Sequence, residues 1–148
     1  MPGYATRSAT ERDLSTIASI YNHAVEHSHA TFDLEPPDLD YWRARLDGQH
    51  PGDHLLVAVT EDDDVVGYAY SWSFRPRPAY GRTKETSVYV HPAHAGAGVG
   101  RALYTELLAR LDQDASVHPQ ISVIALPNPA SEALHLALGF ERVGTLRE

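Results

Sequence analysis

The stretch "HPAHAGAGVGR", His91 to Arg101, holds three glycines at alternate positions, Gly96, Gly98 and Gly100. Glycine lets the backbone bend tightly and lets its N–H groups approach a ligand with no side chain in between. Apolar residues at helical spacing follow and predict a helix beginning near Gly98, with one face formed by Val99, Leu103, Leu107 and Leu111. Because the first N–H groups of a helix attract anions, loop and helix together predict a pyrophosphate site. A turn that merely packs a helix against a strand accounts for the same glycines, so the loop alone leaves both interpretations open.

Two other phosphate-binding loops are excluded by residue identity. A P-loop needs Lys followed by Ser or Thr after its last glycine, whereas Arg101 and Ala102 follow Gly100. A Rossmann loop opens a first βαβ unit and has an acidic residue about 20 positions further on. This loop lies late in the chain, so the dinucleotide pattern does not fit.

Length and composition narrow the classes of protein. The 148 residues fit one domain, 1–148, and 43% hydrophobic with 22% charged residues is typical of a globular protein. A net charge of −8 repels nucleic acid and anionic membranes, so neither is expected as a partner. The absence of cysteine excludes disulfides, a thiolate nucleophile and Cys-ligated zinc. A polar N-terminal segment with no apolar signal core predicts a cytoplasmic location.

The rest of the pattern alternates strands and helices. A strand over 4–9 precedes a capping box, Thr10 with Asp13, and a helix to about residue 27; a second helix covers 39–46. Runs 54–60 and 65–74 predict an antiparallel hairpin around "EDDD", and 85–90 a further strand. After the glycine loop we expect a buried strand at 120–126, a helix with Asn128 as N-cap and Gly139 as stop signal, and a last strand at 141–146. This order predicts an α/β fold with one sheet of mixed direction and helices on its faces.

Several segments resemble one family. "VYVHPAHAGAGVGRALYTELL" (88–108) resembles the acyl-CoA-binding segment of the GNAT N-acetyltransferases. "ATFDLEP", "ETSVYVHP", "ALPNPASEALHLALGF" and "RVGTLRE" are similar to the phosphinothricin (methionine sulfoximine) acetyltransferase subfamily, and the resemblance covers nearly the whole chain in order. It implies an α+β GNAT fold with a mixed, mostly antiparallel sheet, acetyl-CoA as co-substrate, and transfer of an acetyl group to the α-amine of a small amino-acid-like acceptor.

The resemblance also implies which residues hold acetyl-CoA. The backbone of the strand end and of the loop is expected to bind the pantetheine and the pyrophosphate, with Asn128 and Ser131 near the pantetheine arm. The expected set is Val88, Tyr89, Val90, Ala95, Gly96, Gly98, Val99, Gly100, Arg101, Asn128 and Ser131. Ala95 departs from the superfamily, which usually has Arg or Gln there, so one polar contact to the phosphates is lost.

Acyl transfer to an amine needs a base for the ammonium and stabilisation of the departing thiolate. Glu85 matches the family's general base, and His135 matches the residue that protonates the thiolate. Without the resemblance, Glu85 would be interpreted as an exposed carboxylate at the end of a strand, and His135 as a surface histidine. The acceptor site is expected to comprise Phe32, Arg75, Arg77 and Tyr80, because arginines bind carboxylate or phosphinate groups bidentately. Ordinary solvated loop arginines remain the alternative.

Three further expectations complete the interpretation. Transfer is direct, within a ternary complex, since no acyl-carrying nucleophile is evident. No metal is expected, although His23 with His27 and His91 with His94 are close in sequence. The subfamily continues beyond "RVGTLRE" into a final strand that this sequence does not reach, so we expect an open sheet region covered by a homodimer, or a shorter domain. The alternatives are a degenerate GNAT domain that binds CoA or a metabolite without turnover, and an enzyme that acetylates polyamines or protein N-termini.

Overall fold

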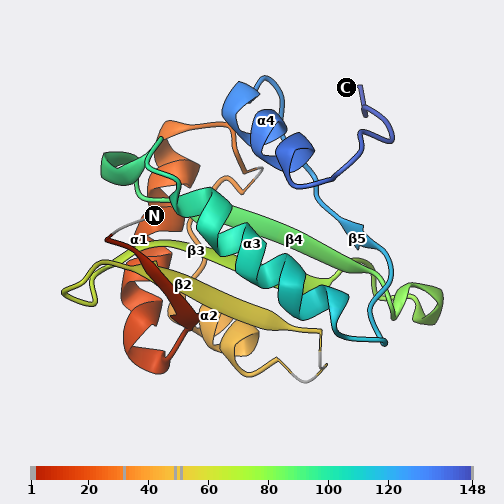
Figure 1. Cartoon of the computed structure of the whole chain (residues 1–148), viewed down its shortest axis with the longest axis horizontal. Helices are drawn as coiled ribbons and strands as arrows, with labels where there is room; N and C mark the ends of the chain where they lie inside the picture. Colours follow the sequence, from red (N-terminus) through yellow and green to blue (C-terminus); the bar gives the residue numbers. More distant parts are fainter. Residues whose placement is uncertain (1–2, 32, 49, 51, 148) are drawn as a thin grey trace.

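One mixed sheet forms the centre of the fold (Figure 1). The computed structural model describes residues 3–31, 33–48, 50 and 52–147. Its strands and helices in chain order are β1 (Ala5–Ser8), α1 (Leu14–His27), α2 (Leu39–Leu46), β2 (His54–Val59), β3 (Val65–Ser73), β4 (Lys84–Val90), α3 (Val99–Asp112), β5 (Gln120–Ile121) and α4 (Pro129–Ala137). Short 3-10 turns lie at Glu11–Asp13 (η1), Pro78–Tyr80 (η2) and Pro92–His94 (η3). None of the helices described is both long and apolar enough to cross a membrane.

The sheet follows the chain in the order β1-β2-β3-β4-β5. The first three pairings are antiparallel, and β4 pairs with β5 in parallel, which confirms the predicted mixed, mostly antiparallel sheet. The β4–β5 ladder is short: it joins Lys84 to Gln120 and Glu85 to Ile121, whereas β4 itself continues to Val90. Beyond Glu85, the two strands no longer pair, and we call the unpaired edge of β4 from Thr86 to Val90 the β4–β5 opening.

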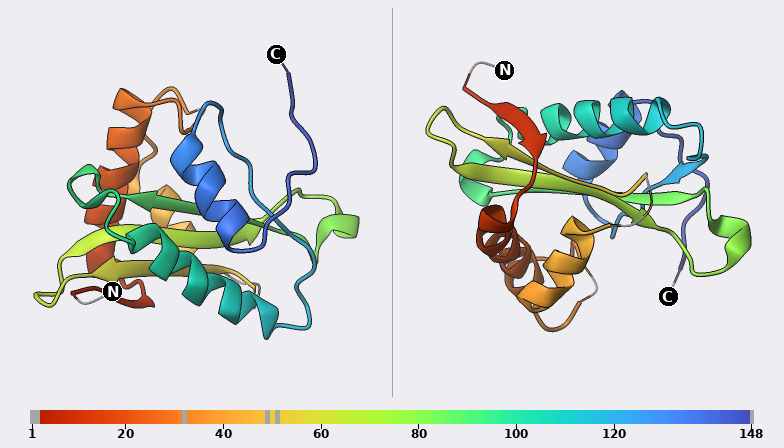
Figure 2. Two further views of the ribbon diagram at one scale, coloured as in Figure 1. Left: turned by 45° about the horizontal axis from the view of Figure 1, so that its top comes forward. Right: turned by 90° about the horizontal axis from the view of Figure 1, so that it is seen from below.

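Helices cover both faces of the sheet, with α1 and α2 on one side and α3 and α4 on the other (Figure 2, right). On the first face, residues of α1 pack with Trp42 of α2 against Leu55, Val57 and Tyr68. On the second face, the stripe of α3 packs against Leu56, Ala58, Val66 and Ala69. Alternate residues of β2 thus point into two separate cores, as the two-residue period of a strand requires. In β3, Val66 and Tyr68 point to opposite cores, because the β2–β3 register shifts beside them.

Local signals in the sequence explain where the helices begin. The Asp13 carboxylate accepts a hydrogen bond from the Thr10 N–H group at 2.8 Å, which forms the predicted capping box before α1. Asn128 caps α4 by accepting from the Ser131 N–H group at 3.3 Å, with Pro129 in the first turn. Gly139 follows α4 with φ +94°, a conformation that glycine adopts without strain.

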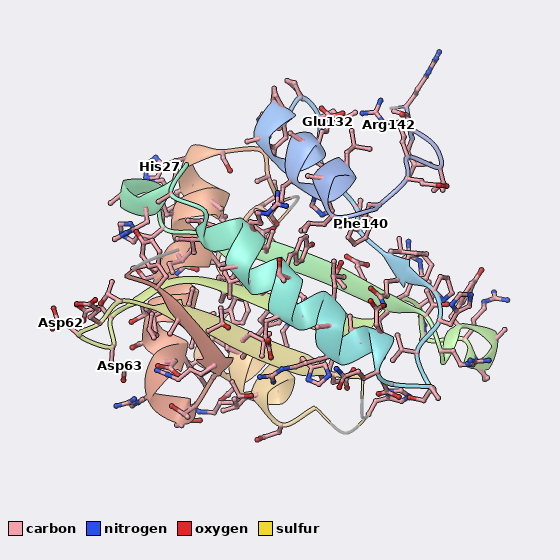
Figure 3. The ribbon with its side chains drawn as sticks, in the orientation of Figure 1. His27, Asp62, Asp63, Glu132, Phe140 and Arg142 are labelled. Carbon is pink, nitrogen blue, oxygen red and sulfur yellow. The ribbon has the colours of Figure 1, made fainter. Side chains whose placement is uncertain are left out.

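Two predicted strands are wrong in whole or in part. The run 120–126 is a strand only at Gln120–Ile121, because the chain then leaves β4, and the side chain of Ser122 donates to the Thr86 carbonyl at 3.1 Å in place of a ladder bond. Residues 141–147 form no strand: Val143 and Leu146 are 96% and 97% exposed, so no sheet face holds them. Instead, an ion pair between Arg142 and Glu132 ties this segment to α4 (Figure 3).

Candidate active site

The glycine loop leads from β4 into α3 and presents its backbone outward. Gly96 and Gly98 have φ values of +77° and +86°, which L-residues with side chains rarely adopt. A Cβ atom on Gly96 would meet none of the described atoms within 4 Å, so the space in front of the loop is open. Gly98 is the N-cap of α3, and the N–H groups of Val99, Gly100 and Arg101 have no carbonyl one turn earlier in the helix to accept them. These N–H groups form an anion-binding end of the helix.

Gly100 serves packing rather than backbone conformation. A Cβ atom there would lie 3.3 Å from Leu134 Cδ2 of α4 and 3.7 Å from Val90 Cγ2 of β4. The first turn of α3 therefore approaches both elements closely because residue 100 has no side chain. This contact fixes the helix end beside the opening between β4 and β5.

The predicted cofactor-binding residues of β4 point to two different faces of the sheet. Val88 and Val90 pack toward α3, on the face that α4 also covers. The Tyr89 side chain points to the other face, where its ring stacks on Tyr68 at 5.5 Å and meets Tyr21 edge-on at 5.2 Å. Burial raises the pKa of the Tyr89 hydroxyl, which therefore stays protonated. Tyr89 thus packs, and only its backbone remains beside the opening.

Acetyl-CoA fits the residues around this opening. The free edge of β4 offers backbone groups to the two amides of a pantetheine chain, and the helix end offers N–H groups to a diphosphate. Asn128 uses its amide oxygen as the cap of α4, which leaves its N–H₂ group as the end available to a ligand. Ala95 is exposed and adds no polar side chain to the loop.

His135 lies beside the unpaired edge of β4, at the centre of a buried hydrogen-bond network that reaches the Thr86 carbonyl through Ser122. Its side chain is on α4 and the residue is 5% exposed. Its Nε2 atom lies 2.8 Å from the Ser122 hydroxyl and 3.1 Å from the Tyr104 hydroxyl. Its Nδ1 atom lies 2.7 Å from the Ser131 carbonyl. Phe140 follows α4 (Figure 3), and its ring packs against that of His135 with centroids 5.0 Å apart.

These contacts define the protonation state of His135. A carbonyl only accepts, so Nδ1 carries the proton and Nε2 accepts from a hydroxyl. Burial lowers the pKa of His135, although the bond to Ser131 opposes this in part, and the neutral form is favoured. Burial also raises the pKa of Tyr104, which keeps that hydroxyl as a donor.

Glu85 lies on the opposite face of the sheet from His135. Side chains alternate along β4, and Thr86 contacts Tyr104 on the α3 face, at 3.4 Å between hydroxyl oxygens. Glu85 therefore faces the α1 and α2 side, in register with Trp72 of β3. The two predicted catalytic groups flank the β4–β5 opening from its two sides and do not form a direct pair.

Three of the four residues predicted to bind the acceptor lie together in the structure. Arg75, Arg77 and Tyr80 line one surface hollow with Phe74 and Pro76, on the loop between β3 and β4. Arg75 donates one hydrogen bond to the Phe74 carbonyl at 2.9 Å, and its guanidinium group stacks on the Phe74 ring. Phe32 lies outside the described residues.

The network contains residues that sequence reasoning missed, namely Thr86, Tyr104 and Ser122. Tyr104 carried the clearest signal, because it falls within the buried stripe of α3, where a tyrosine hydroxyl needs a partner. Within the described part of the chain, no three or more His, Cys, Asp or Glu side chains are grouped to hold an ion, and the absence of a metal stays a prediction.

Comparison with known proteins identifies the family. Residues 17–140 match the model of the acetyltransferase (GNAT) family. The phosphinothricin N-acetyltransferase of Streptomyces coelicolor is 41% identical over 155 residues, covering 100% of this chain and 90% of that protein. The L-methionine sulfoximine/L-methionine sulfone acetyltransferase of Salmonella typhimurium is 36% identical, covering 90% of this chain and 78% of that protein.

A solved structure agrees with these matches. A GNAT superfamily phosphinothricin acetyltransferase from Sinorhizobium meliloti, in complex with acetyl-CoA, has a TM-score of 0.89 at 37% identity and covers 96% of this chain and 77% of that one. The chain therefore belongs to the acetyltransferase (GNAT) family. It has the GNAT fold and is an acyltransferase, and the resemblance to the phosphinothricin and methionine sulfoximine acetyltransferases is confirmed.

Proposed function

We propose that the protein transfers an acetyl group from acetyl-CoA directly to the α-amine of a small amino-acid-like acceptor of the phosphinothricin or methionine sulfoximine type. The observation that carries the proposal is the opening between β4 and β5, which has an anion-binding helix end beside it and the two candidate catalytic groups on opposite faces. Relatives named for these acceptors support the substrate class.

In this proposal, backbone groups of Val88 to Val90 hold the pantetheine with Asn128, and the loop from Ala95 to Arg101 holds the diphosphate. Val99, Gly100 and Arg101 contribute helix N–H groups, and Ser131 lies one turn into α4 beside His135. Bound acetyl-CoA supplies the activated acyl group.

Glu85 acts as the base on the acceptor side. It takes a proton from the acceptor's ammonium, directly or through one water, and the freed nitrogen lone pair attacks the acyl carbon. The nitrogen–carbon bond forms, the carbon–sulfur bond breaks, and the nitrogen loses its second proton as the amide is completed. Both nitrogen protons pass to solvent through Glu85, and the CoA sulfur receives one proton from His135, which takes it from solvent, so one proton is released in the whole reaction.

His135 protonates the departing thiolate from the other face. Its Nε2 atom accepts a hydrogen bond in the neutral state, so it must first bind a second proton there. Because burial disfavours the imidazolium, that form is a strong acid and gives up its proton readily. The hydroxyls of Ser122 and Tyr104, both on Nε2, connect His135 to the opening.

Thiol release from acetyl-CoA tests the function, followed with a chromogenic disulfide over a panel of amino acids with spermidine as a cationic control. Glu85→Gln and His135→Ala should each lower turnover by about 10²-fold, the usual scale for acid–base groups. Full rates in both variants would contradict the assigned roles. Binding of CoA without release of thiol for any acceptor would favour the second candidate, a domain without turnover, which Ala95 in place of a polar residue supports.

We also propose that the chain is a single domain that forms a homodimer in the cytoplasm. Apolar side chains near the opening are solvent-exposed, with Val123 at 54% and Leu136 at 61%. A second copy that covers them would remove this area from water. Light scattering coupled to gel filtration should give twice the mass of 16.3 kDa, and a monomer mass at micromolar concentration would contradict this proposal.

A further inference from the structure

A guanidinium group is enclosed by aromatic rings on the face of the sheet that carries Glu85. The Cζ atom of Arg45 lies 4.6 Å from the centroid of the Tyr41 ring, 4.3 Å from that of Tyr70 and 5.2 Å from that of Trp72. Arg45 and Tyr41 belong to α2, and the other two rings to β3. Ring faces attract the cation and hold it in place.

Two of the three nitrogens of this guanidinium have no hydrogen-bond partner among the described residues. One terminal nitrogen of Arg45, Nη2, donates to the Tyr41 hydroxyl at 2.6 Å. The Nε and Nη1 atoms are enclosed and have no acceptor. No ion pair within the described residues includes Arg45. Arg45 is partly exposed, but enclosing two of its charged N–H groups without an acceptor is unfavourable, so this position calls for an anion that the described chain does not supply.

The unpaired cation lies close to the proposed base. In the β3–β4 register, Trp72 is opposite Glu85 and Tyr70 is opposite Ser87. The Tyr70 hydroxyl experiences both charges: burial mainly raises its pKa, while Arg45 lowers it and Glu85 raises it. Arg45 lies over the rings of Tyr70 and Trp72, and Glu85 is opposite Trp72, so the two charges lie on the same face of β3 and β4.

An α-amino acid has this arrangement of charges, since its carboxylate and its amine are bonded to one carbon. We propose that Arg45 binds the α-carboxylate of the acceptor through its unpartnered N–H groups and so places the α-amine at Glu85. This inference rests on the proposed function. Arg75 and Arg77, on the exposed loop, then bind the oxygen atoms at the end of the acceptor's side chain, which belong to a phosphinate, sulfoximine or sulfone group. Entry of the carboxylate requires the partly exposed ring of Trp72 to turn aside.

The test compares an acid with its amide. Arg45→Met should raise the KM for L-methionine sulfone at least 10-fold with little change in kcat, because an anchoring contact is made equally in ground and transition states. The α-carboxamide of the same compound, which has no carboxylate, should be used as well by the variant as by the wild type. Equal losses for acid and amide, or an unchanged ratio of kcat/KM between them, would overturn the proposal.

Two further variants guard against a folding artefact. Arg45→Lys keeps the positive charge and should lose part of the preference for the acid over the amide. A complete loss of activity with both acceptors would contradict the proposal. Arg43→Met is the matched control, because Arg43 is exposed on the same helix and paired with Glu11 and Asp40. Arg43→Met should leave the preference for the acid over the amide unchanged. If it lowered this preference as much as Arg45→Met does, the effect would come from the charge of α2 in general, and the proposal would be overturned.

A binding measurement separates this inference from the proposed function. If wild type releases no thiol with any acceptor, the proposed function fails, and tryptophan fluorescence then decides the role of Arg45. L-methionine sulfone should quench the fluorescence of the wild type, through Trp72, and should not quench that of Arg45→Met. Equal quenching in both, or none in either, would overturn the carboxylate site.

Discussion

Substituting a single loop glycine tests whether the backbone near α3 binds the diphosphate. Gly96→Ala adds a methyl group where φ is +77°, at a cost of about 1–2 kcal/mol for an L-residue. Gly96 is exposed and the added Cβ would touch none of the described atoms within 4 Å, so the free loop can relax to a negative φ. The strain then returns on binding, and a loss of about 1–2 kcal/mol weakens binding by a factor of about 5–30.

Titration calorimetry with CoA measures this change directly, and Gly139→Ala is the matched control. Gly139 has φ +94°, is exposed and has the same open surroundings, but it lies after α4 rather than in the loop. The control should lower the melting temperature by roughly 2–8 °C, the shift that about 1–2 kcal/mol gives in a chain of this size, and leave the Kd for CoA within about twofold. Wild-type affinity in Gly96→Ala, or equal weakening in both variants, would refute the reasoning.

Two other predictions concern stability. Burial lowers the pKa of His54 and His135 in the folded protein, so near and below the ordinary histidine pKa of about 6.5 the unfolded chain binds more protons than the folded one. The free energy of unfolding should therefore be constant above about pH 6.5 and fall below it. His135→Gln should make this dependence on pH less steep, as measured by urea titrations between about pH 5 and 7. An unchanged slope would contradict the buried neutral state. Lys84→Met should cost about 3–5 kcal/mol, because it removes the partner of Asp53, which lies 2.5 Å away and whose side chain is only 6% exposed. Asp53→Asn in the same chain should recover part of the loss, and a cost under about 1 kcal/mol would count against the pair.

The elements with local signals were predictable from the sequence. α2 spans 39–46 as predicted, and α4 begins after Asn128, because caps and stop residues act within a few positions of the chain. The glycine loop was predictable for the same reason. Its φ values belong to Gly96 and Gly98 themselves and need no distant partner.

Features that depend on distant partners were not predictable. The apolar run 120–126 has the composition of a strand, but a strand ends where its neighbour diverges, and β5 ends at Ile121. The opposite orientation of Glu85 and His135 follows from the pairing register of β4 and from the packing of α4. The aromatic enclosure of Arg45 joins α2 to β3, and nothing in the local sequence around residue 45 signals it.

A crystal structure of the complex with CoA tests the central claim most directly. We expect the diphosphate within hydrogen-bond distance of backbone N–H groups between Gly96 and Arg101, with the pantetheine running along the free edge of β4 toward His135. A diphosphate bound elsewhere, or an opening between β4 and β5 filled by the protein's own side chains, would contradict the account.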